Sequence, residues 1–191
     1  MTDPISLFHR WFAEARRAGL AEPEAMALAT ADRRGRPSVR YVLLKEADAR
    51  GFVFCTQTTG RKCRELRANP RASLVFYWPP THRQVRVEGP VEEISRAEAV
   101  EHWMKRPRES RLAGLASKQS LPVRSHAALM AEFRRVSREH RGREVLAPAT
   151  WTGFRVKPEA IEFWIRGEHR LHQRQLFTRR NGRWTSRLLC P

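Results

Sequence analysis

Hydrophobic residues recur at two spacings along the chain, one typical of helices and one typical of strands. After Asp3 and Pro4, apolar side chains recur at intervals of three and four as far as Gly19. An Asp that caps the first turn, followed by Pro at the first helical position, is a common helix start, and Gly is a common end. The pattern predicts an amphipathic helix within residues 1–20 that lies on a core.

From Ala25 onward the pattern changes to short apolar runs at close spacing, joined by turns that contain Gly and Pro. Such runs favour an antiparallel sheet or barrel over a parallel arrangement of alternating strands and helices. The predicted strands lie within residues 25–32, 38–46, 52–56, 72–78, 83–94, 156–165, 169–179 and 183–189.

Between these strands, residues 95–140 have a helical pattern. Ser95 and Glu98 have the spacing of a capping box, and Pro107 ends the helix that they open. A second helix is predicted from about Ser125 to His140. We expect a single α+β domain over residues 1–191, built on an antiparallel barrel with a helical insertion at 95–140.

Charge narrows the range of partners. The chain carries 37 Lys and Arg against 20 Asp and Glu, a formal net charge of +17, which favours anionic partners. The arginines are spread through the whole chain and form no basic block, so nucleic-acid binding is a minority hypothesis. No stretch predicts a membrane span or a signal peptide.

The three cysteines, Cys55, Cys63 and Cys190, have no metal-binding spacing and are odd in number. We therefore expect free thiols, a cytoplasmic protein and no metal site.

The segment that begins at Thr58 follows a strand and opens a short helix with Arg61 and Lys62 in its first turn. The helix dipole disfavours cations at this end unless an anion lies nearby. The two residues are therefore candidates for an anion site, although an ordinary exposed basic turn fits the pattern equally well.

Cationic residues also surround the last strands. If residues 170–174 are extended, Arg170, His172 and Arg174 share one face, while Leu171 and Gln173 share the other. The three could form one wall of an anion site or belong to a solvated edge strand, and the stretch alone does not decide.

Other candidates are weaker. The strand from Arg40 to Lys45 has a cation at each end, residues 106–110 and 117–120 are polar loops, and Gln84 faces away from Val85. The chain has no Gly-rich phosphate loop, no metalloprotease motif and no serine-hydrolase motif. If the protein is an enzyme, a cofactor supplies the chemistry.

Taken together and in order, several segments resemble the pyridoxamine (pyridoxine) 5′-phosphate oxidase family, which are FMN enzymes of the split-barrel fold. The segments are ALATAD, GRPSVRYVLLK, GFVFCT, GRKCREL, RQVRVEG, RPRESRLAGLASKQS, IEFW, GEHRLHQR and the terminal RLLCP. The resemblance covers nearly the whole chain, and the motifs are specific as a set.

The resemblance implies an antiparallel split barrel and a homodimer with FMN at its interface. The residues that it places at FMN are Arg40, Tyr41, Val42, Leu43, Leu44, Lys45, Cys55, Thr56, Arg61, Lys62, Gln84, Gln119, Ser120, Trp164 and Arg174.

It also implies the reaction, in which pyridoxamine or pyridoxine 5′-phosphate is oxidised to pyridoxal 5′-phosphate while oxygen is reduced to peroxide. Arg170 and His172 would lie over the substrate ring as the catalytic pair. The other residues expected at the substrate are Lys45, His102, Arg106, Ser110 and Leu171.

The chain departs from the family pattern mainly near the substrate. His102 replaces a Tyr that helps to hold the substrate phosphate, Cys55 replaces another Tyr, and Gln173 replaces an Asp. A flavin oxidase for another substrate, such as the phenazine-biosynthesis oxidases, therefore stays open beside the vitamin B6 reaction. A basic binding protein without enzymatic activity is the third alternative.

Overall fold

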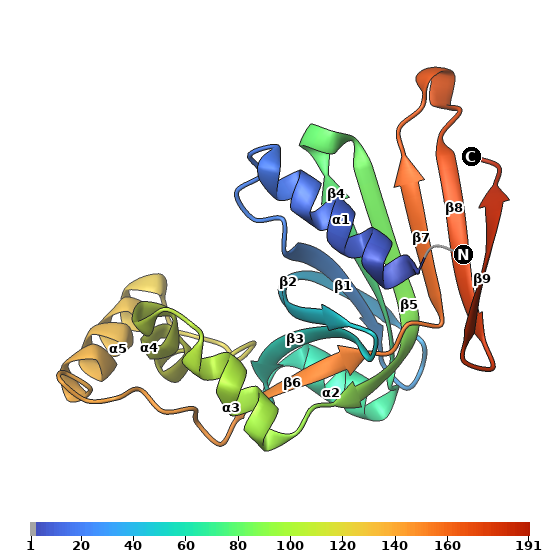
Figure 1. Ribbon diagram of the computed structural model, residues 1–191. Helices are drawn as coiled ribbons and strands as arrows, with labels where there is room; N and C mark the ends of the chain where they lie inside the picture. Colours follow the sequence, from blue (N-terminus) through green and yellow to red (C-terminus); the bar gives the residue numbers. More distant parts are fainter. Residues whose placement is uncertain (1–2) are drawn as a thin grey trace.

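The central feature of the computed structural model, which describes residues 3–191, is a closed antiparallel barrel (Figure 1). Its strands follow the order β4-β1-β2-β3-β6-β5, and β5 pairs back onto β4 to close it. The strand bounds are β1 Ala25–Ala31, β2 Pro37–Asp48, β3 Gly51–Gln57, β4 Arg71–Trp78, β5 Arg83–Glu93 and β6 Trp151–Val156.

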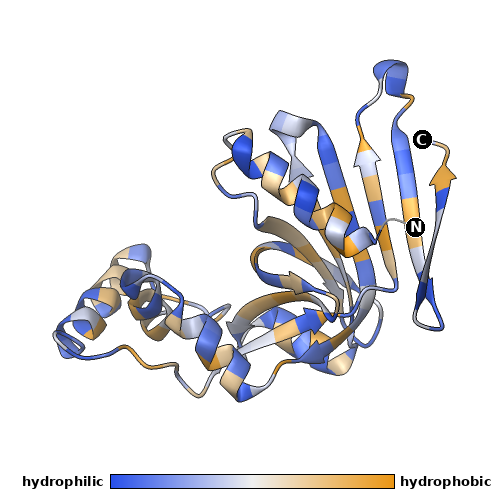
Figure 2. Cartoon of the chain, viewed as in Figure 1, coloured by the Kyte–Doolittle hydropathy of each residue, from blue (hydrophilic) through white to orange (hydrophobic). Residues whose placement is uncertain are grey.

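Three further strands, all antiparallel, extend the sheet from β5. Their bounds are β7 Ala160–Ile165, β8 Gln173–Arg180 and β9 Arg183–Leu189. They stand beside the barrel in Figure 1, and the connection from β7 to β8 forms a largely hydrophilic tip in Figure 2. A 3₁₀ turn, η2 Glu168–Arg170, occupies that tip, and a second one, η1 Pro79–Thr81, joins β4 to β5.

Helix α1, Pro4–Arg17, packs against the barrel through the apolar face that its spacing predicted. The Phe8 ring lies 4.9 Å from that of Phe52 and 5.1 Å from that of Phe76, centre to centre. Aromatic pairs at such distances add to the hydrophobic effect of burial. Helix α2, Arg61–Ala68, buries Leu66 in the same core.

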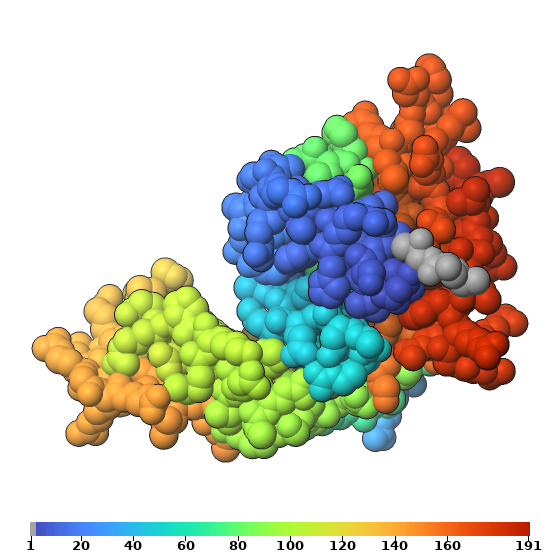
Figure 3. Space-filling model, viewed as in Figure 1, coloured from blue at the N-terminus to red at the C-terminus, as the bar shows by residue number. Residues whose placement is uncertain are grey.

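The helical insertion consists of α3 Arg96–Met104, α4 Arg108–Ala116 and α5 His126–Glu139. It projects from the barrel as a separate lobe (Figure 3). A second apolar cluster joins the two parts, with Trp103 against Trp151 at 4.9 Å and Val53 of β3 beneath them. The apolar run of β3 is thus buried on both faces, Phe52 and Phe54 toward the barrel and Val53 toward the helices.

The predicted helix starts are confirmed, since the side chains of Asp3, Ser95 and Ser125 each accept a backbone hydrogen bond at their caps. Met1 and Thr2, part of the predicted 1–20 segment, lie outside the described residues. The antiparallel barrel is confirmed as well.

Three details of the prediction are wrong. Residues 106–110 are not a loop, because Pro107 caps helix α4 at Arg108. Residues 156–165 are not one strand, because Pro158 separates β6 from β7. Residues 170–174 are not one extended segment, since β8 begins only at Gln173. Across residues 3–191, the helices are all too short or too polar to span a membrane.

Candidate functional site

The start of α2 is a compact polar site. Gly60 is the N-cap, and a Cβ there would lie 3.0 Å from Gln119 Oε1, so a larger residue would crowd the helix start. The Lys62 side chain, 6% exposed, turns back toward β3 and donates to Thr56 Oγ1 at 3.0 Å and to Gln119 Oε1 at 2.9 Å. Gln57 holds the Gln119 loop in place by accepting from its backbone N–H at 3.0 Å.

Lys62 has no carboxylate partner within the described part of the chain, since both of its hydrogen-bond acceptors are neutral. Burial and the nearby charge of Arg40 lower the pKa of Lys62 to about 8. A buried ammonium group is costly unless an anion compensates it. Its position at a helix N-terminus, where backbone N–H groups also point outward, suits a phosphate group.

The neighbouring cations share one carboxylate, Glu65. Arg40 contacts Glu65 Oε2 at 3.2 Å, and Arg61 Nε donates to Glu65 Oε1 at 2.7 Å. Burial acts to raise the pKa of Glu65, but hydrogen bonds from Ser38, Thr30 and Arg61 outweigh it and lower the pKa to about 2. Arg40 is therefore held on the barrel side, whereas the Arg61 side chain is 58% exposed and pairs with Glu65 from the solvent side.

A second group of cations lies around Cys55 on β3. The register between β2 and β3 shifts between Leu44 and Glu46, which places a bulge at Lys45, and bulges commonly redirect a side chain near functional sites. Burial raises the pKa of the Cys55 thiol to about 12, while the charges of Lys45 and Arg106 act in the opposite direction. The thiol is thus protonated and lies within electrostatic range of both cations.

Arg106 is held by aromatic stacking. Its guanidinium carbon lies 4.6 Å from the ring centre of Trp151 and 5.3 Å from that of Trp103, and Nη2 donates to the Ser110 carbonyl at 2.8 Å. Burial lowers the pKa of Arg106, which nevertheless keeps its charge. The remaining donors of this fixed fork are suited to an oxyanion.

Three predicted cofactor residues lie side by side on adjacent strands. Gln84 of β5 pairs with Trp164 of β7, which pairs with Arg174 of β8. All three face away from the core, and for Gln84 the alternation along its strand predicted this. The carboxylate of Glu162, 3% exposed, fixes Arg174 through Nε at 2.7 Å and also holds Arg86 at 2.8 Å.

The turn before β8 differs from the predicted strand. His169 and Arg170 have positive φ angles of 50° and 65°, so Arg170 does not alternate with His172 and Arg174. The tight turn requires Gly167, where a Cβ would lie 2.0 Å from the Leu171 carbonyl oxygen. The chain can then fold back so that His172 Nδ1 accepts from the Gly167 N–H at 3.2 Å.

This turn surrounds a cavity of about 600 Å³. The centre of the His172 ring lies 4.6 Å from that of the Trp164 ring. This contact connects the turn to Gln84, Trp164 and Arg174, the row of predicted cofactor residues on β5, β7 and β8. Arg170 also lines the cavity, whereas the Leu171 side chain is 70% exposed. The residues that line the cavity are His82, Arg166, Gly167, Glu168, His169, Arg170 and His172.

His102, expected at a substrate phosphate, is 5% exposed, and its Nε2 faces Glu46 Oε2 at 3.6 Å. A carboxylate at this distance would repel a phosphate group, so the surroundings do not favour that role. Burial lowers the pKa of His102, although the charge of Glu46 acts in the opposite direction.

The structure thus brings the predicted residues into three groups: the α2 start, the surroundings of Cys55 and the β5–β7–β8 row. On β2, Tyr41 and Leu43 point outward, whereas Val42 and Leu44 pack on the core. Ser120 lies in the loop beside Gln119 with a φ of 68°. Within residues 3–191, hydrogen bonds connect members inside the first group and inside the third but do not connect these two groups.

Several residues that hold the candidate site residues in place were not predicted from the sequence. They are Gln57, Glu65, Trp103, Trp151 and Glu162. Glu65 could have been found, because it follows Arg61 by four positions on a predicted helix. The others lie far in sequence from the residues that they hold.

A closed antiparallel barrel with three extra strands defines a split-barrel protein. Comparisons with known proteins narrow this class. The model of the family described as pyridoxamine 5′-phosphate oxidase matches residues 12–140. The model described as the pyridoxine 5′-phosphate oxidase C-terminal dimerisation region matches residues 151–191.

Curated relatives match over nearly the full length. A pyridoxine/pyridoxamine 5′-phosphate oxidase of Rubrobacter xylanophilus is 51% identical over 99% of this chain and 87% of its own. The protein of the same name from Anaeromyxobacter dehalogenans is 49% identical over 99% of this chain and 96% of its own. The chain belongs to the pyridoxamine 5′-phosphate oxidase family.

Solved structures agree on the fold. PhzG from Burkholderia lata, determined in complex with tetrahydrophenazine-1-carboxylic acid, superposes with a TM-score of 0.94 at 34% identity, over 100% of this chain and 94% of that one. A pyridoxamine 5′-phosphate oxidase-related, FMN-binding protein from Nostoc punctiforme superposes with a TM-score of 0.80 over the whole of both chains. At 20% identity, the second supports the fold alone.

Proposed function

We propose that this family member is an FMN-dependent oxidase that converts pyridoxamine 5′-phosphate or pyridoxine 5′-phosphate to pyridoxal 5′-phosphate, with oxygen as the acceptor and peroxide as the second product. The name shared by relatives at 43–51% identity supports the reaction. Membership of the family supports a flavin-dependent oxidase, and we propose that the flavin is FMN.

The observation that carries the cofactor proposal is the buried Lys62 ammonium, whose hydrogen-bond partners are neutral. FMN ends in a phosphate, which would supply the missing anion at the start of α2. Arg61 would add a second charge from the exposed side, while Thr56 and Gln119 keep Lys62 aimed at the site. We infer that Gln84, Trp164 and Arg174 contact another part of the same cofactor.

We propose that the substrate phosphate binds to Lys45, Arg106 and Ser110. Lys45 is placed by the β2 bulge and Arg106 by its stacking on two tryptophans, so both cations are oriented before substrate arrives. The neutral thiol of Cys55 between them adds no charge that would repel the phosphate.

Bound flavin would accept the hydride and pass the electrons to oxygen. The chain's own part is to orient the substrate ring and to neutralise its charge. Arg170 and His172 would do so from the turn before β8, where the Gly167 contact and the Trp164 ring fix the imidazole. Leu171, exposed between them, would close the ring pocket from the side.

We further propose a homodimer with FMN at its interface. The outer face of the barrel exposes apolar side chains at Val39 (69%), Tyr41 (78%) and Tyr77 (56%), and such an apolar patch is typical of an interaction surface. The family match to a dimerisation region over 151–191 supports self-association. A dimer would let the α2 group of one chain approach the β7–β8 row of its partner.

The three cysteines are free thiols, which supports a cytoplasmic location as part of the same proposal.

Two measurements test the proposal. Flavin released by denaturation should chromatograph as FMN, at about one molecule per chain. Oxygen uptake with peroxide formation should follow addition of pyridoxine 5′-phosphate. Release of FAD would overturn the cofactor assignment, and oxygen uptake only with another substrate would overturn the reaction.

The second candidate is oxidation of a tetrahydrophenazine-type ring acid, which the PhzG structure favours by its full-length superposition. This substrate carries a carboxylate in place of a phosphate. Its oxidation by this protein, without oxidation of pyridoxine 5′-phosphate, would select this candidate.

A further inference from the structure

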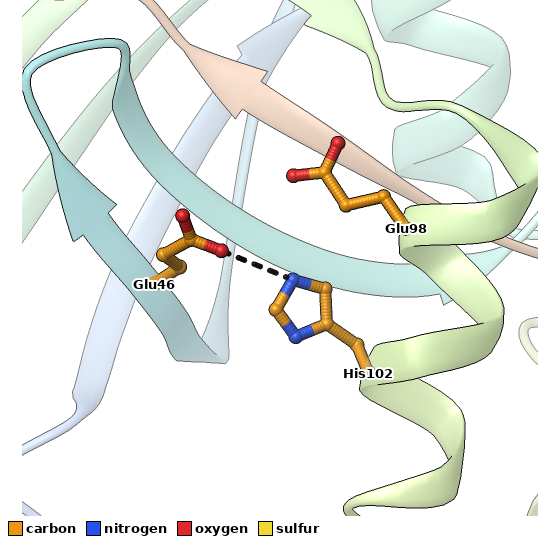
Figure 4. Close-up of side chains that lie close together, drawn as sticks. All are labelled: Glu46, Glu98 and His102. Atoms are coloured by element: carbon orange, nitrogen blue, oxygen red, sulfur yellow. Dashed lines mark ion pairs between the residues drawn. The ribbon is translucent and has the colours of Figure 1, made fainter.

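Three side chains with metal-ligand chemistry converge where β2 meets α3. Glu46 comes from β2, and Glu98 and His102 come from α3, four residues apart and therefore on one face of the helix (Figure 4). One ligand atom from each lies within 4.8 Å of the other two. The sequence predicted no metal site, because it showed no Cys or His spacing and because Glu46 is far from the other two along the chain.

The histidine points to a ligand. His102 is 5% exposed, and its Nε2 has no hydrogen-bond partner within the described residues. This atom is aimed into the space between the two carboxylates, 3.6 Å from Glu46 Oε2 (Figure 4). A buried polar atom without a partner is uncommon in a native protein and calls for an unseen water or ion.

The two carboxylates are already oriented. Arg50 Nη2 contacts Glu46 Oε1 at 2.7 Å, and Arg155 Nη2 pairs with Glu98 Oε1. Each carboxylate therefore engages an arginine through one oxygen and keeps its second oxygen for another partner. Metal-binding carboxylates are commonly held in this way by outer hydrogen bonds.

The charge state also suits a metal. The Nε2 atom of a neutral imidazole can offer its lone pair to a metal ion. Two carboxylates together carry the charge that balances a divalent cation.

We propose that Glu46, Glu98 and His102 bind one divalent transition-metal ion of the zinc class, with solvent completing the coordination. One imidazole with two carboxylates is a ligand set for Zn²⁺ and its neighbours, whereas Mg²⁺ prefers oxygen ligands alone. Donor atoms that share a zinc ion lie roughly 3–4 Å apart, so small rotations of the two glutamates would complete the site.

The test is calorimetric titration of the purified, flavin-loaded protein with Zn²⁺, and with Mg²⁺ for comparison. The parent for this experiment is Cys190→Ser, because the exposed Cys190 thiol can itself bind zinc. Bound flavin is measured in every sample, so that failure of the metal site and failure of the flavin proposal are told apart.

We expect one Zn²⁺ per chain in the parent, no saturable Mg²⁺ binding, and a rise in melting temperature with Zn²⁺. His102→Gln and Glu46→Gln should each weaken Zn²⁺ binding by about tenfold or more, as loss of a ligand does. The matched control is His126→Gln, at the exposed start of α5, and should bind as the parent does. The Glu46 side chain is one-third exposed, so Glu46→Gln should still fold. It therefore tests the metal site even if the variant at the buried His102 does not fold.

Absence of saturable Zn²⁺ binding in the parent would overturn the proposal. Equal binding by the parent and by Glu46→Gln would overturn it too, because the zinc would then lie elsewhere.

Discussion

At the scale of single residues, the most informative side chain is Lys62, because its ammonium group is buried without a carboxylate partner in the described part of the chain. Its two acceptors, Thr56 and Gln119, are neutral, and its pKa is lowered to about 8. Arg61, its neighbour, already has a carboxylate partner in Glu65. Lys62 is therefore the cation that an FMN phosphate would neutralise.

Replacement of Lys62 by Met should reduce FMN affinity by about 10- to 100-fold, the usual value of a charge-assisted hydrogen bond. Reconstitution of the apoprotein with FMN, followed by flavin fluorescence, measures this directly. The matched control is Arg64→Met on the exposed side of the same helix, which should bind FMN normally. An equal loss of FMN affinity in both variants would show that FMN binding depends on the net charge of the helix and not on Lys62 itself.

The pKa of Lys62 leads to a pH dependence with a definite sign. The folded-state value of about 8 lies below the ordinary 10.5, so the ammonium charge is present below pH 8 and is lost above it. FMN affinity of the apoprotein should therefore fall as pH rises from 8 to 9, by as much as about tenfold per pH unit for one proton. Lys62→Arg should flatten this profile, because arginine keeps its charge. A profile that is the same in both proteins would remove Lys62 from the phosphate site.

At the scale of elements, the sequence predicted well where periodicity and caps act locally. The strand alternation that placed Gln84 outward and the helix start at Ser95 are both confirmed, although the Glu98 carboxylate pairs with Arg155 instead of completing the capping box. The prediction was wrong where a single close backbone contact sets the local conformation. Gly167 packs against the Leu171 carbonyl, and the residues between them form a 3₁₀ turn where a strand was expected. Contacts such as Arg106 on Trp151 join residues far apart in sequence, and no local pattern specifies them.

The Gly167 turn gives a prediction of its own. Gly167→Ala would place a Cβ 2.0 Å from the Leu171 carbonyl oxygen, so the turn must shift, with a destabilisation of about 1–3 kcal/mol. Displacement of Arg170 and His172 should slow flavin reduction by substrate while FMN stays bound. Urea unfolding and rapid-mixing reduction measure the two effects.

The control for this variant is Gly182→Asn in the hairpin between β8 and β9. Gly182 has a φ of +76° and no atom near the added Cβ, and Asn tolerates this conformation. This change should leave flavin reduction unchanged. Normal flavin reduction in Gly167→Ala would mean that the turn does not position Arg170 and His172 for the reaction that we propose.

At the scale of the whole molecule, a single chain leaves its candidate groups apart and an apolar barrel face open. Tyr41 and Tyr77 both lie on that face. The dimer would cover the face and bring the α2 start of one chain to the β7–β8 row of the other. Such an arrangement would depend on contacts between two chains, which local sequence patterns do not specify, so the sequence implied it only through family resemblance.

Tyr41→Asp should therefore produce a monomer with little bound flavin, because a charge would be buried in the interface. Sedimentation velocity and the ratio of flavin to protein absorbance measure both results. Leu146→Asp, at a side chain that is 64% exposed in the connection between α5 and β6, is the control and should stay dimeric. A Tyr41→Asp protein that remains dimeric and yellow would place the interface elsewhere.

We propose that this protein oxidises vitamin B6 compounds that carry a phosphate and that it recognises the phosphate through Lys45, Arg106 and Ser110. The most direct measurement is the rate at which bound flavin loses its absorbance when the protein is mixed, without oxygen, with pyridoxine 5′-phosphate or with pyridoxine. We expect fast bleaching by pyridoxine 5′-phosphate and little by pyridoxine. Bleaching at equal rates by both compounds, or by neither, would contradict it.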